Sequence, residues 1–554
     1  MHWASFDPFT IEDAYWQDKM GMPVANLEFL QAILVAGDVD SFRFFCADAA
    51  QSRKFSNKLR QLVPTAGSKI QVLPQALAPQ SLRRQPPDVM HNGDFTHYMP
   101  YLIEWRNRAF ADRPFPITGV THSLDTVSLH GKFIQLLLAN PKPYDAIICS
   151  SQCAVDMLRN SFAGIREALK VAYGASLPAP PRLVRIPLGI ADREFTAGQK
   201  TVARRRLGIP EDRFVLLHLA RFSPRRKMDL APFLEALAGL KGRTFAGRSL
   251  PPWQLILAGA GKKADLTLVQ EMLARLGLDR EVRIEPNVTR ERKELLFQAA
   301  DTFCSLVDNH QETFGLTVVE AMARGLPVIA SDFNGYKELV SPGRTGFLIP
   351  TYESLGHEPW EALSGLLDPS MLRFYRAQKI SFDIDTFSDA VVQMAFRPEL
   401  REAMGRRARI RAEPYRWSSI LKDYHQLWKS LAREARMTRG KKNVGGNPLP
   451  LLTPCMNRSF SHFPSGSISS DSILGSSAHA SCLPKGFEPI RYDEMAILLR
   501  DDCLHFILEQ FEKGDCNVRE LEDEVVDRFR MDQDLILVHL DWLLKHGLIT
   551  VKKL

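Results

Sequence analysis

The chain has 554 residues, and its 45% hydrophobic and 24% charged residues are typical of globular proteins. This composition excludes a wholly disordered chain, and the length predicts roughly three or four domains. Lys and Arg total 71 against 64 Asp and Glu, a net charge of +7, but residues 487–554 hold 9 basic and 16 acidic residues. The basic remainder suits anionic ligands such as nucleotide diphosphates or an anionic membrane surface, although a solvated basic surface explains the charge equally well.

Eight cysteines are few for this length, and none are clustered with the spacing of metal ligands. No apolar run approaches the ~18 residues of a membrane span. The N-terminal residues also lack the basic and apolar regions of a signal peptide. We therefore expect a cytoplasmic protein with reduced thiols, and peripheral contact with the inner face of the membrane stays open.

The first third of the chain alternates short apolar runs with amphipathic helical patterns, including a helix expected over 97–110. Continuous apolar runs are typical of parallel strands that helices cover on both faces. The pattern predicts a doubly wound, Rossmann-like α/β domain over 1–187. Its strands are expected at 42–47, 69–74, 117–122 and 146–151.

A second α/β series over 188–412 predicts another Rossmann-like domain facing the first across a cleft. Pro187 and Gly189, between the two series, fit a hinge. The strands of the second domain are expected at 214–220, 253–261, 282–286, 302–307, 327–331 and 346–349.

The pattern changes after the second series. A helix over 413–435 is followed by a Gly-, Pro- and Ser-rich stretch, 436–486, in which ten of the 23 residues from Ser459 to Ser481 are serine. Such composition is typical of a flexible linker. Residues 487–554 then predict a small acidic module of three helices and a short terminal strand, with Gly547 closing the last helix.

The stretch ETFGLTVVEAMARGLPVIASDFNG, residues 312–335, carries the clearest chemistry. A strand precedes it and a helix begins near Gly315, so the amides of Phe314, Gly315 and Leu316 are expected at a helix N-terminus, where phosphate binds. Glu320 lies about one turn further and is expected to reach a ribose. Glu312 lies outside the helix, nearer a sugar.

Without their context, Glu320 would more simply be a solvated helix residue and Glu312 a substitute for an N-cap. Gly315, Gly325 and Pro327, followed by an apolar strand, favour the functional interpretation instead. Two glutamates with seven residues between them would then bracket a nucleotide-sugar.

Several segments together resemble the family-4 retaining glycosyltransferases of the GT-B fold. They are ARFSPRRKMDL (220–230), LILAGAG (255–261), the Glu312–Glu320 region, RIPLGIADREF (185–195) and YRWSSILKDYHQLW (415–428). The resemblance covers roughly 1–435 and is strongest after Val184. It implies an acceptor domain over 1–187, a nucleotide-sugar donor domain over 188–412 and a closing helix over 413–435 that crosses back to the first domain.

The resemblance places Arg221 and Lys227 on the diphosphate of the donor. Cations at the carboxyl end of a strand suit the binding of a diphosphate. A solvated basic loop is the simpler explanation of these residues. Arg226 is the alternative phosphate ligand if the register of the loop is shifted. By the same analogy, Val288 gives a backbone contact to the base.

In the first domain, GMPVANLEFLQAIL from Gly21 resembles the family's Gly-rich loop, which makes Gly21 a candidate diphosphate contact. It departs from the pattern because Gly21-Met22 replaces a double glycine and no strand is evident just before it. An ordinary helix entry with Pro23 in the first turn explains it equally well. The resemblance places His122 facing the transferred sugar, where imidazole can donate to a hydroxyl, although a lone histidine after a strand is more often structural. His91 and Asp94 are candidates for the acceptor side.

The implied reaction is retaining transfer without a protein nucleophile, with His122 and Glu312 as candidate catalytic residues. No Asp-x-Asp motif appears where a metal would be needed, so neither a metal nor another cofactor is expected, and the nucleotide-sugar is a substrate. The acceptor, whether glycan, lipid, peptide or small molecule, is not indicated. The alternatives are a non-catalytic scaffold of the same fold that docks partners through the acidic module, and a phosphorylase, for which no pyridoxal phosphate motif is present.

The module at 487–554 resembles a winged helix and, over about 490–551, pyrroloquinoline quinone biosynthesis protein D, though without that domain's N-terminal strands. Asp532, Asp534 and Asp541 make the last helix acidic, which argues against nucleic acid as a partner. A peptide or protein partner is expected instead.

Overall fold

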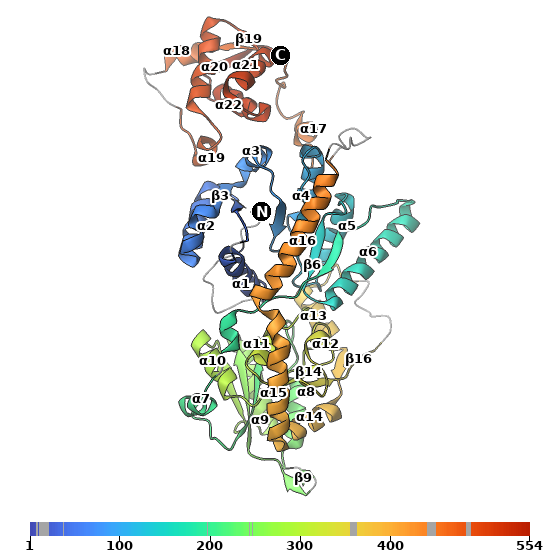
Figure 1. Cartoon of the computed structure of the whole chain (residues 1–554). Helices are drawn as coiled ribbons and strands as arrows, with labels where there is room; N and C mark the ends of the chain where they lie inside the picture. Colours follow the sequence, from blue (N-terminus) through green and yellow to red (C-terminus); the bar gives the residue numbers. More distant parts are fainter. Residues whose placement is uncertain are drawn as a thin grey trace.

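The computed structural model describes residues 1–6, 9, 21–36, 38–196, 198–242, 244–245, 247–354, 363–439, 450–483 and 489–554. Two α/β halves are stacked end to end, and a small C-terminal module lies beyond the first half, on the side away from the second (Figure 1). The predicted pair of doubly wound α/β halves is confirmed.

The first half is built on a seven-stranded parallel sheet of order β3-β2-β1-β4-β5-β6-β7. Its strands are β1 His2–Ser5, β2 Ser41–Cys46, β3 Ile70–Pro74, β4 Val89–Asn92, β5 Ile117–Val120, β6 Ala146–Cys149 and β7 Arg182–Arg185. Its helices are α1 Gly21–Val35, α2 Ala49–Leu62, α3 Ala78–Arg84, α4 Met99–Ala109, α5 Ser128–Leu138 and α6 Gln152–Tyr173.

Strand β1 corrects the sequence analysis, which found no strand before Gly21. The four residues His2–Ser5 lie at the middle of the sheet, paired with β2 and β4. The segment HWAS has no aliphatic run, so its pattern does not indicate a strand. Burial comes from its neighbours, because Trp3 packs against Phe42, Phe44 and Trp428.

The second half is built on a six-stranded parallel sheet of order β12-β11-β8-β13-β14-β15. Its strands are β8 Phe214–Leu219, β11 Trp253–Gly259, β12 Val282–Pro286, β13 Thr302–Ser305, β14 Val328–Ser331 and β15 Gly346–Ile349. Its helices are α7 Lys200–Leu207, α8 Ala231–Leu240, α9 Lys263–Leu276, α10 Arg290–Ala299, α11 Leu316–Ala323, α12 Tyr336–Leu339, α14 Ile384–Phe396 and α15 Pro398–Ala412.

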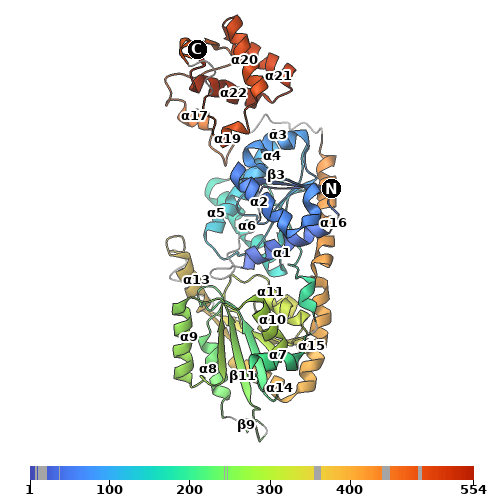
Figure 2. The ribbon, with the colours of Figure 1, turned by 90° about the vertical axis from the view of Figure 1, so that its left-hand side faces the viewer.

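Two excursions leave this sheet. The short hairpin β9 Thr244–Phe245 and β10 Arg248–Ser249 projects from the end distant from the first half (Figure 2). The other contains helix α13 Pro369–Ala377 between the antiparallel strands β16 Thr351–Glu353 and β17 Ile380–Phe382.

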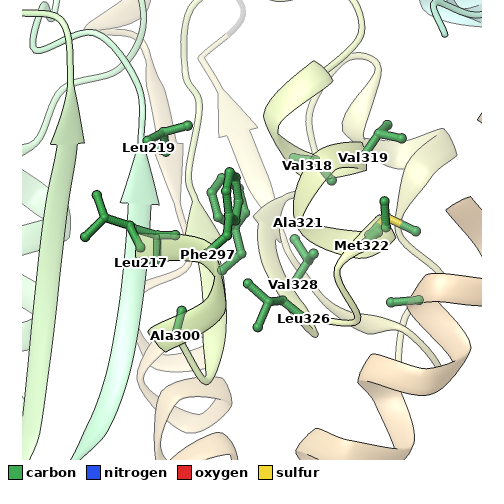
Figure 3. Packing of buried hydrophobic residues seen from close by; sticks show 14 of the residues in the cluster. Leu217, Leu219, Phe297, Ala300, Val318, Val319, Ala321, Met322, Leu326 and Val328 are labelled. Carbon is green, nitrogen blue, oxygen red and sulfur yellow. The ribbon is translucent and has the colours of Figure 1, made fainter. Parts of the chain in front are cut away.

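Helix α11 is fixed by the core beneath it. Val318, Ala321 and Met322 of α11 belong to one buried cluster with Leu217 of β8 and Val328 of β14 (Figure 3). These side chains are fully buried, so the start of α11 is held rigidly against the carboxyl ends of the central strands.

Helix α16, Trp417–Met437, follows α15 and returns along the first half (Figures 1 and 2). Its side chains Trp417, Tyr424 and Trp428 enter the core of the first half. The chain therefore crosses between the halves twice. The two crossings are bonded to each other, because the Ile190 amide donates to the Tyr415 carbonyl (2.8 Å) and the Trp417 amide donates to the Ile190 carbonyl (3.2 Å).

The C-terminal module contains the three predicted helices, α20 Asp501–Lys513, α21 Val518–Phe529 and α22 Gln533–Lys545, and the terminal strand β20 Ile549–Lys553. Its sheet has the order β19-β18-β20, with β18 Ile473–Ser476 in the middle and β19 Cys516–Asn517 at one edge. The predicted boundary at 487 is therefore wrong, since β18 comes from the serine-rich stretch. The short helices α17 Met456–Phe460, α18 Ala478–Cys482 and α19 Asp493–Ala496 complete this region.

The stretch before the module is also anchored. The carboxylate of Glu104 on α4 accepts hydrogen bonds from the amides of Leu451 (2.6 Å) and Leu452 (3.0 Å) and from the hydroxyl of Thr453 (3.2 Å). Leu452 packs against the core of the first half. Residues 451–453 of the predicted linker are thus docked on the first half rather than free, because a buried carboxylate satisfies their hydrogen-bond donors.

Candidate functional site

A cavity of about 210 Å³ lies between the two halves, at the carboxyl ends of their strands. The first half contributes Thr121, His122 and Ser123, which follow β5. The second half contributes the end of β8 with Arg221, the loop residues Arg226 and Lys227, and residues 311–317. In the second sheet, the strand order reverses between β8 and β13, both of which lead into the cavity, and ligands of doubly wound folds bind at such a point. In the first sheet, the order reverses between β1 and β4, and the contributing strand β5 is the next strand along.

The N-terminus of α11 opens into this cavity, as the sequence predicts. Gly315 has φ +111°, and a Cβ there would lie 2.5 Å from the Tyr336 ring, so glycine is required on both counts. The first-turn amides of Leu316 and Thr317 have no partner within their own helix, as at every helix start. The Phe314 amide, by contrast, donates to the Glu312 carboxylate at 3.2 Å, so in this state it is not available to a phosphate.

Lys227 and Glu312 form an ion pair inside the cavity, with side chains that are 14% and 16% exposed. Burial alone lowers the pKa of Lys227, but the adjacent Glu312 carboxylate outweighs burial and the pKa is raised. Burial likewise raises the pKa of Glu312, but Lys227 and the Phe314 amide outweigh it and the pKa is lowered. Both groups are therefore held in their charged forms, as a binding site for a diphosphate and a polar sugar requires.

The loop after β8 places Arg221 beside Lys227. The Arg221 guanidinium donates to the Arg226 carbonyl at 3.1 Å, which folds the loop back on itself. The predicted pair, Arg221 and Lys227, is thus brought together, and Arg226 also lines the cavity.

Glu320 lies one turn into α11, just beyond the residues that line the cavity. One carboxylate oxygen accepts from Lys293 of α10 at 2.7 Å. The other oxygen is buried and has no hydrogen-bond partner among the described residues, and the same holds for Oγ1 of Thr317, three residues earlier on the same helix face. Val288 lies in the loop between β12 and α10 and packs against the same core as α11.

His122 lines the cavity from the opposite side. Its Nε2 lies 2.6 Å from the Gly93 carbonyl, so the ring donates to the backbone there. Burial lowers the pKa of His122, although Asp94 acts in the opposite direction. The predicted donation from His122 to a sugar hydroxyl is therefore corrected: a neutral ring that donates through Nε2 offers Nδ1 as an acceptor. Asp94 accepts from the Thr96 amide at 2.6 Å in the loop after β4.

The prediction that His91 lines the acceptor side is wrong. Its ring is fully buried under α16, with the rings of Phe29 and Trp428 5.2 and 5.1 Å away, and Nδ1 lies 2.9 Å from Thr118 Oγ1. Burial lowers the pKa of His91 to about 3, so it is a neutral core residue. Gly21 is the first residue of α1, but the preceding residues 10–20 lie outside the described part of the chain, so its diphosphate contact stays a prediction.

Sequence reasoning missed several polar residues that complete the site. Thr313 donates to the His122 carbonyl at 3.0 Å, and Gln311 donates to Ser123 Oγ at 3.3 Å. These bonds join the β13–α11 loop to the loop after β5, so the two halves close around the cavity. The signal available in the sequence was a run of polar residues beside Glu312 and His122, but a single sequence does not reveal which loops meet.

The second half also carries a family signature. Residues 199–358 match the family described as Glycosyl transferases group 1. The D-inositol 3-phosphate glycosyltransferase of Geodermatophilus obscurus is 34% identical over 269 residues, which are 47% of this chain and 56% of that protein. D-inositol 3-phosphate glycosyltransferase 2 of Catenulispora acidiphila is 31% identical over 261 residues, 45% of this chain and 56% of that protein. The chain thus spans about half the length of the curated relatives it matches.

Solved structures share the architecture of both halves. A sucrose-phosphate synthase from Thermosynechococcus elongatus superposes with a TM-score of 0.50 at 18% identity and covers 78% of this chain and 100% of its own. HepE of Anabaena, solved with UDP, gives a TM-score of 0.51 at 18% identity with the same coverage. The fold of the two halves is therefore GT-B, as the sequence predicts.

Two further features bear on the environment of the protein. Among the described residues, no group of three or more His, Cys, Asp or Glu side chains is arranged to hold a metal ion. Within the same part of the chain, no helix combines the length and apolar character needed to span a bilayer.

Proposed function

We propose that the protein is a retaining glycosyltransferase of family 4 that moves a sugar from a nucleotide-diphosphate sugar to an acceptor hydroxyl. The observation that carries this proposal is the pair of buried oxygens without a partner among the described residues, Thr317 Oγ1 in the cavity lining and Glu320 Oε2 just beyond it, on the helix whose start faces the cations of the cavity. Buried polar atoms without partners are rare, and a bound ligand is one of their ordinary explanations.

The donor is bound through its charge and its ribose. Arg221, Lys227 and the first-turn amides of α11 take the diphosphate, and Glu320 accepts hydrogen bonds from the ribose hydroxyls. Val288 contacts the base through its backbone, and Gly21 approaches the diphosphate from the first half. The two cations offset the negative charge of the leaving group without a metal ion.

The reaction needs no protein nucleophile. The acceptor hydroxyl attacks the anomeric carbon on the face that the leaving diphosphate vacates, the bond from that carbon to the phosphate oxygen breaks, and a phosphate oxygen takes the hydroxyl proton. The configuration is thereby retained. Glu312 and His122 hold the sugar hydroxyls, and Asp94 shapes the acceptor side, so the protein contributes positioning and charge stabilisation.

Calorimetry with UDP, GDP and ADP, followed by their sugar conjugates, tests the donor site. We expect one nucleotide to bind and Glu320→Ala to weaken it by about 1.5–3 kcal/mol for each lost bond, because a charged acceptor is removed. Thr317→Val keeps the side-chain shape and is expected to cost about 0.5–1.5 kcal/mol. Glu271→Ala on the exposed face of α9 is the matched control. Unchanged affinity in Glu320→Ala would contradict the ribose contact. Failure to bind any of the nucleotides would contradict the proposed function.

Hydrolysis or transfer separates the enzyme from a non-catalytic scaffold of the same fold. A scaffold binds the nucleotide without turning over the sugar conjugate, whereas the enzyme releases nucleoside diphosphate. Glu312→Ala and His122→Ala are expected to lose turnover while keeping affinity for the free nucleotide, since both residues lie at the sugar end of the cavity. Full turnover in both variants would contradict the active-site assignment.

We also propose that the C-terminal module, a winged-helix-like domain, docks a protein or peptide rather than nucleic acid. Residues 487–554 carry a net charge of −7, and nucleic-acid binding needs a basic face. Pull-down by the full chain compared with a chain that ends at Arg439, together with duplex DNA as a competitor, tests this proposal. Binding of DNA that depends on the module would overturn it.

A further inference from the structure

Helix α13 joins the two halves at the edge of the cavity. The helix belongs to the excursion between β15 and α14 and lies at the end of the second half that faces the first half (Figure 2). From this helix, the Arg373 guanidinium donates to both carboxylate oxygens of Asp125 in the first half, through Nε to Oδ2 and through Nη2 to Oδ1 (3.3 Å). The Asp125 side chain is 2% exposed and that of Arg373 is 15% exposed.

Each end of this contact lies close to a site residue. Asp125 follows His122 by three residues in the loop after β5. Gln378, immediately after α13, donates to Asp229 Oδ2 at 2.9 Å, and Asp229 follows Lys227 by two residues. Helix α13 therefore connects the loop that carries His122 with the loop that carries Lys227.

The pair favours the closed arrangement of the halves. A buried carboxylate without a partner is costly, and its desolvation is offset only while the guanidinium is in contact. The contact exists only when the halves are closed, because its partners belong to different halves. A bidentate guanidinium–carboxylate contact also fixes the relative orientation of the two side chains, which a lysine would do less well.

We propose that Arg373 and Asp125 form an interdomain clasp that positions His122 against Glu312, and that sugar transfer depends on this clasp whereas nucleotide binding does not. The proposal rests on the glycosyltransferase function proposed above. Arg373 and Asp125 are positioning residues, since neither lines the cavity. Apart from Gly21, the proposed nucleotide contacts lie on the second half, including Arg221, Lys227 and Glu320, so they stay in place when the halves open.

Other contacts also link the halves. Hydrogen bonds between uncharged groups, from Thr313 to the His122 carbonyl and from Gln311 to Ser123 Oγ, reach the same loop after β5. Glu338 on α12 accepts from the amides of Gln152 (2.6 Å) and Cys153 (3.2 Å) and pairs with Arg185 (3.0 Å). These contacts hold the start of α6, which follows β6, and not the loop after β5. The clasp is the charged, two-bond contact to the loop after β5, so its loss is expected to weaken the hold on that loop and to displace His122, even where the halves stay associated.

The test measures transfer, nucleotide affinity and shape in the full chain. Arg373→Ala is expected to lower kcat for transfer on the order of 10- to 100-fold, the effect of a small misplacement, while the Kd for the free nucleotide stays unchanged. Small-angle scattering is expected to give a larger radius of gyration. Arg373→Lys should restore part of kcat, and Arg376→Ala, a change on the same helix at a residue that does not contact Asp125, is the matched control.

A second variant keeps the test decisive if Arg373→Ala fails to fold. Asp125→Asn combined with Arg373→Gln removes both charges and leaves no unpaired carboxylate, so it is expected to fold even where Arg373→Ala does not, and still to lose kcat. Wild-type kcat and radius of gyration in this double variant would overturn the clasp, and so would a loss of nucleotide affinity equal to the loss of kcat. Absence of turnover in the wild-type chain would instead contradict the proposed function, and scattering alone would then decide whether the pair holds the halves together.

Discussion

Lys227 and Glu312 are separated by 85 residues in the chain, yet their side chains meet as an ion pair in the cavity between the halves. Lys227 follows the end of β8 and Glu312 follows the end of β13, and these strands are neighbours in the sheet. The pair thus results from the reversal of strand order at β8, which leaves room above the sheet for two loops to meet. Each residue fixes the charge state of the other before any ligand arrives.

Removing both partners of this pair should cost less than the sum of the losses from removing each partner alone. Lys227→Ala leaves the Glu312 carboxylate buried and unpaired, and Glu312→Ala leaves the ammonium group, so each is expected to cost roughly 3–5 kcal/mol or somewhat less at this partial exposure. The double variant should cost less than the sum of the two, and urea unfolding of the second half measures all three. Strictly additive losses would mean that the two side chains do not interact.

Gly335 should not tolerate even a methyl group. Its φ of −64° is accessible to any residue, but a Cβ would lie 2.4 Å from the Thr313 carbonyl oxygen and 2.7 Å from the Phe314 Cα. Gly335→Ala is therefore expected to push back the loop that carries Glu312 and to reduce transfer strongly. Gly131→Ala on α5, where nothing lies within 4 Å, is the matched control. Equal activity in both variants would show that the loop yields without consequence.

Asp308 should make the stability of the protein depend on pH. Burial raises the pKa of Asp308 to about 8, against about 3.9 in an unfolded chain. The folded state therefore holds this proton more tightly, and the stabilisation is complete below pH ~4 and is lost as the pH rises towards ~8. Asp308→Asn cannot ionise and still accepts from the Asp229 amide, so its stability relative to wild type should rise across this range. Parallel stability curves for the two proteins would contradict the raised pKa.

Glu104 should control how firmly the C-terminal module is held. The described contacts of the module with the first half are ion pairs such as Arg83 with Asp532 (3.2 Å), which are exposed and contribute little. Glu104→Ala removes the bonds to residues 451–453, so limited proteolysis in that segment is expected to become faster. A chain that ends at Arg439 should fold and bind nucleotide, because α16 is complete. Aggregation of that chain would show that the first half needs Leu452 to cover its core.

The fold of both halves could be predicted from the sequence because apolar parallel strands and amphipathic helices leave regular patterns. Arg221, Lys227, Glu312 and Gly315 follow the ends of such strands, so their meeting could also be predicted. Strand β1 could not be, since four residues with one tryptophan carry no pattern of their own.

Contacts between distant segments could not be predicted from the sequence for a different reason. His91 lies within β4 and His122 follows β5, and the packing of α16 over His91 makes that residue part of the core. Arg373 and Asp125 meet because an excursion of one half reaches the other, and Glu104 meets residues 451–453 because the chain returns to α4. Nothing local to these residues encodes the encounter.

The hydrogen bonds between Ile190 and residues 415 and 417 join the two connections between the halves into one two-stranded hinge. A single connection would let one half rotate about any axis relative to the other. Two connections bonded side by side bend together about one line and resist both twisting and sliding. The side chain of Trp417 lies where any Cβ on Gly189 would be, so the joint is also tightly filled. The halves should therefore open by rotation about a single hinge axis. Each closure should then return His122 to the same position relative to Glu312.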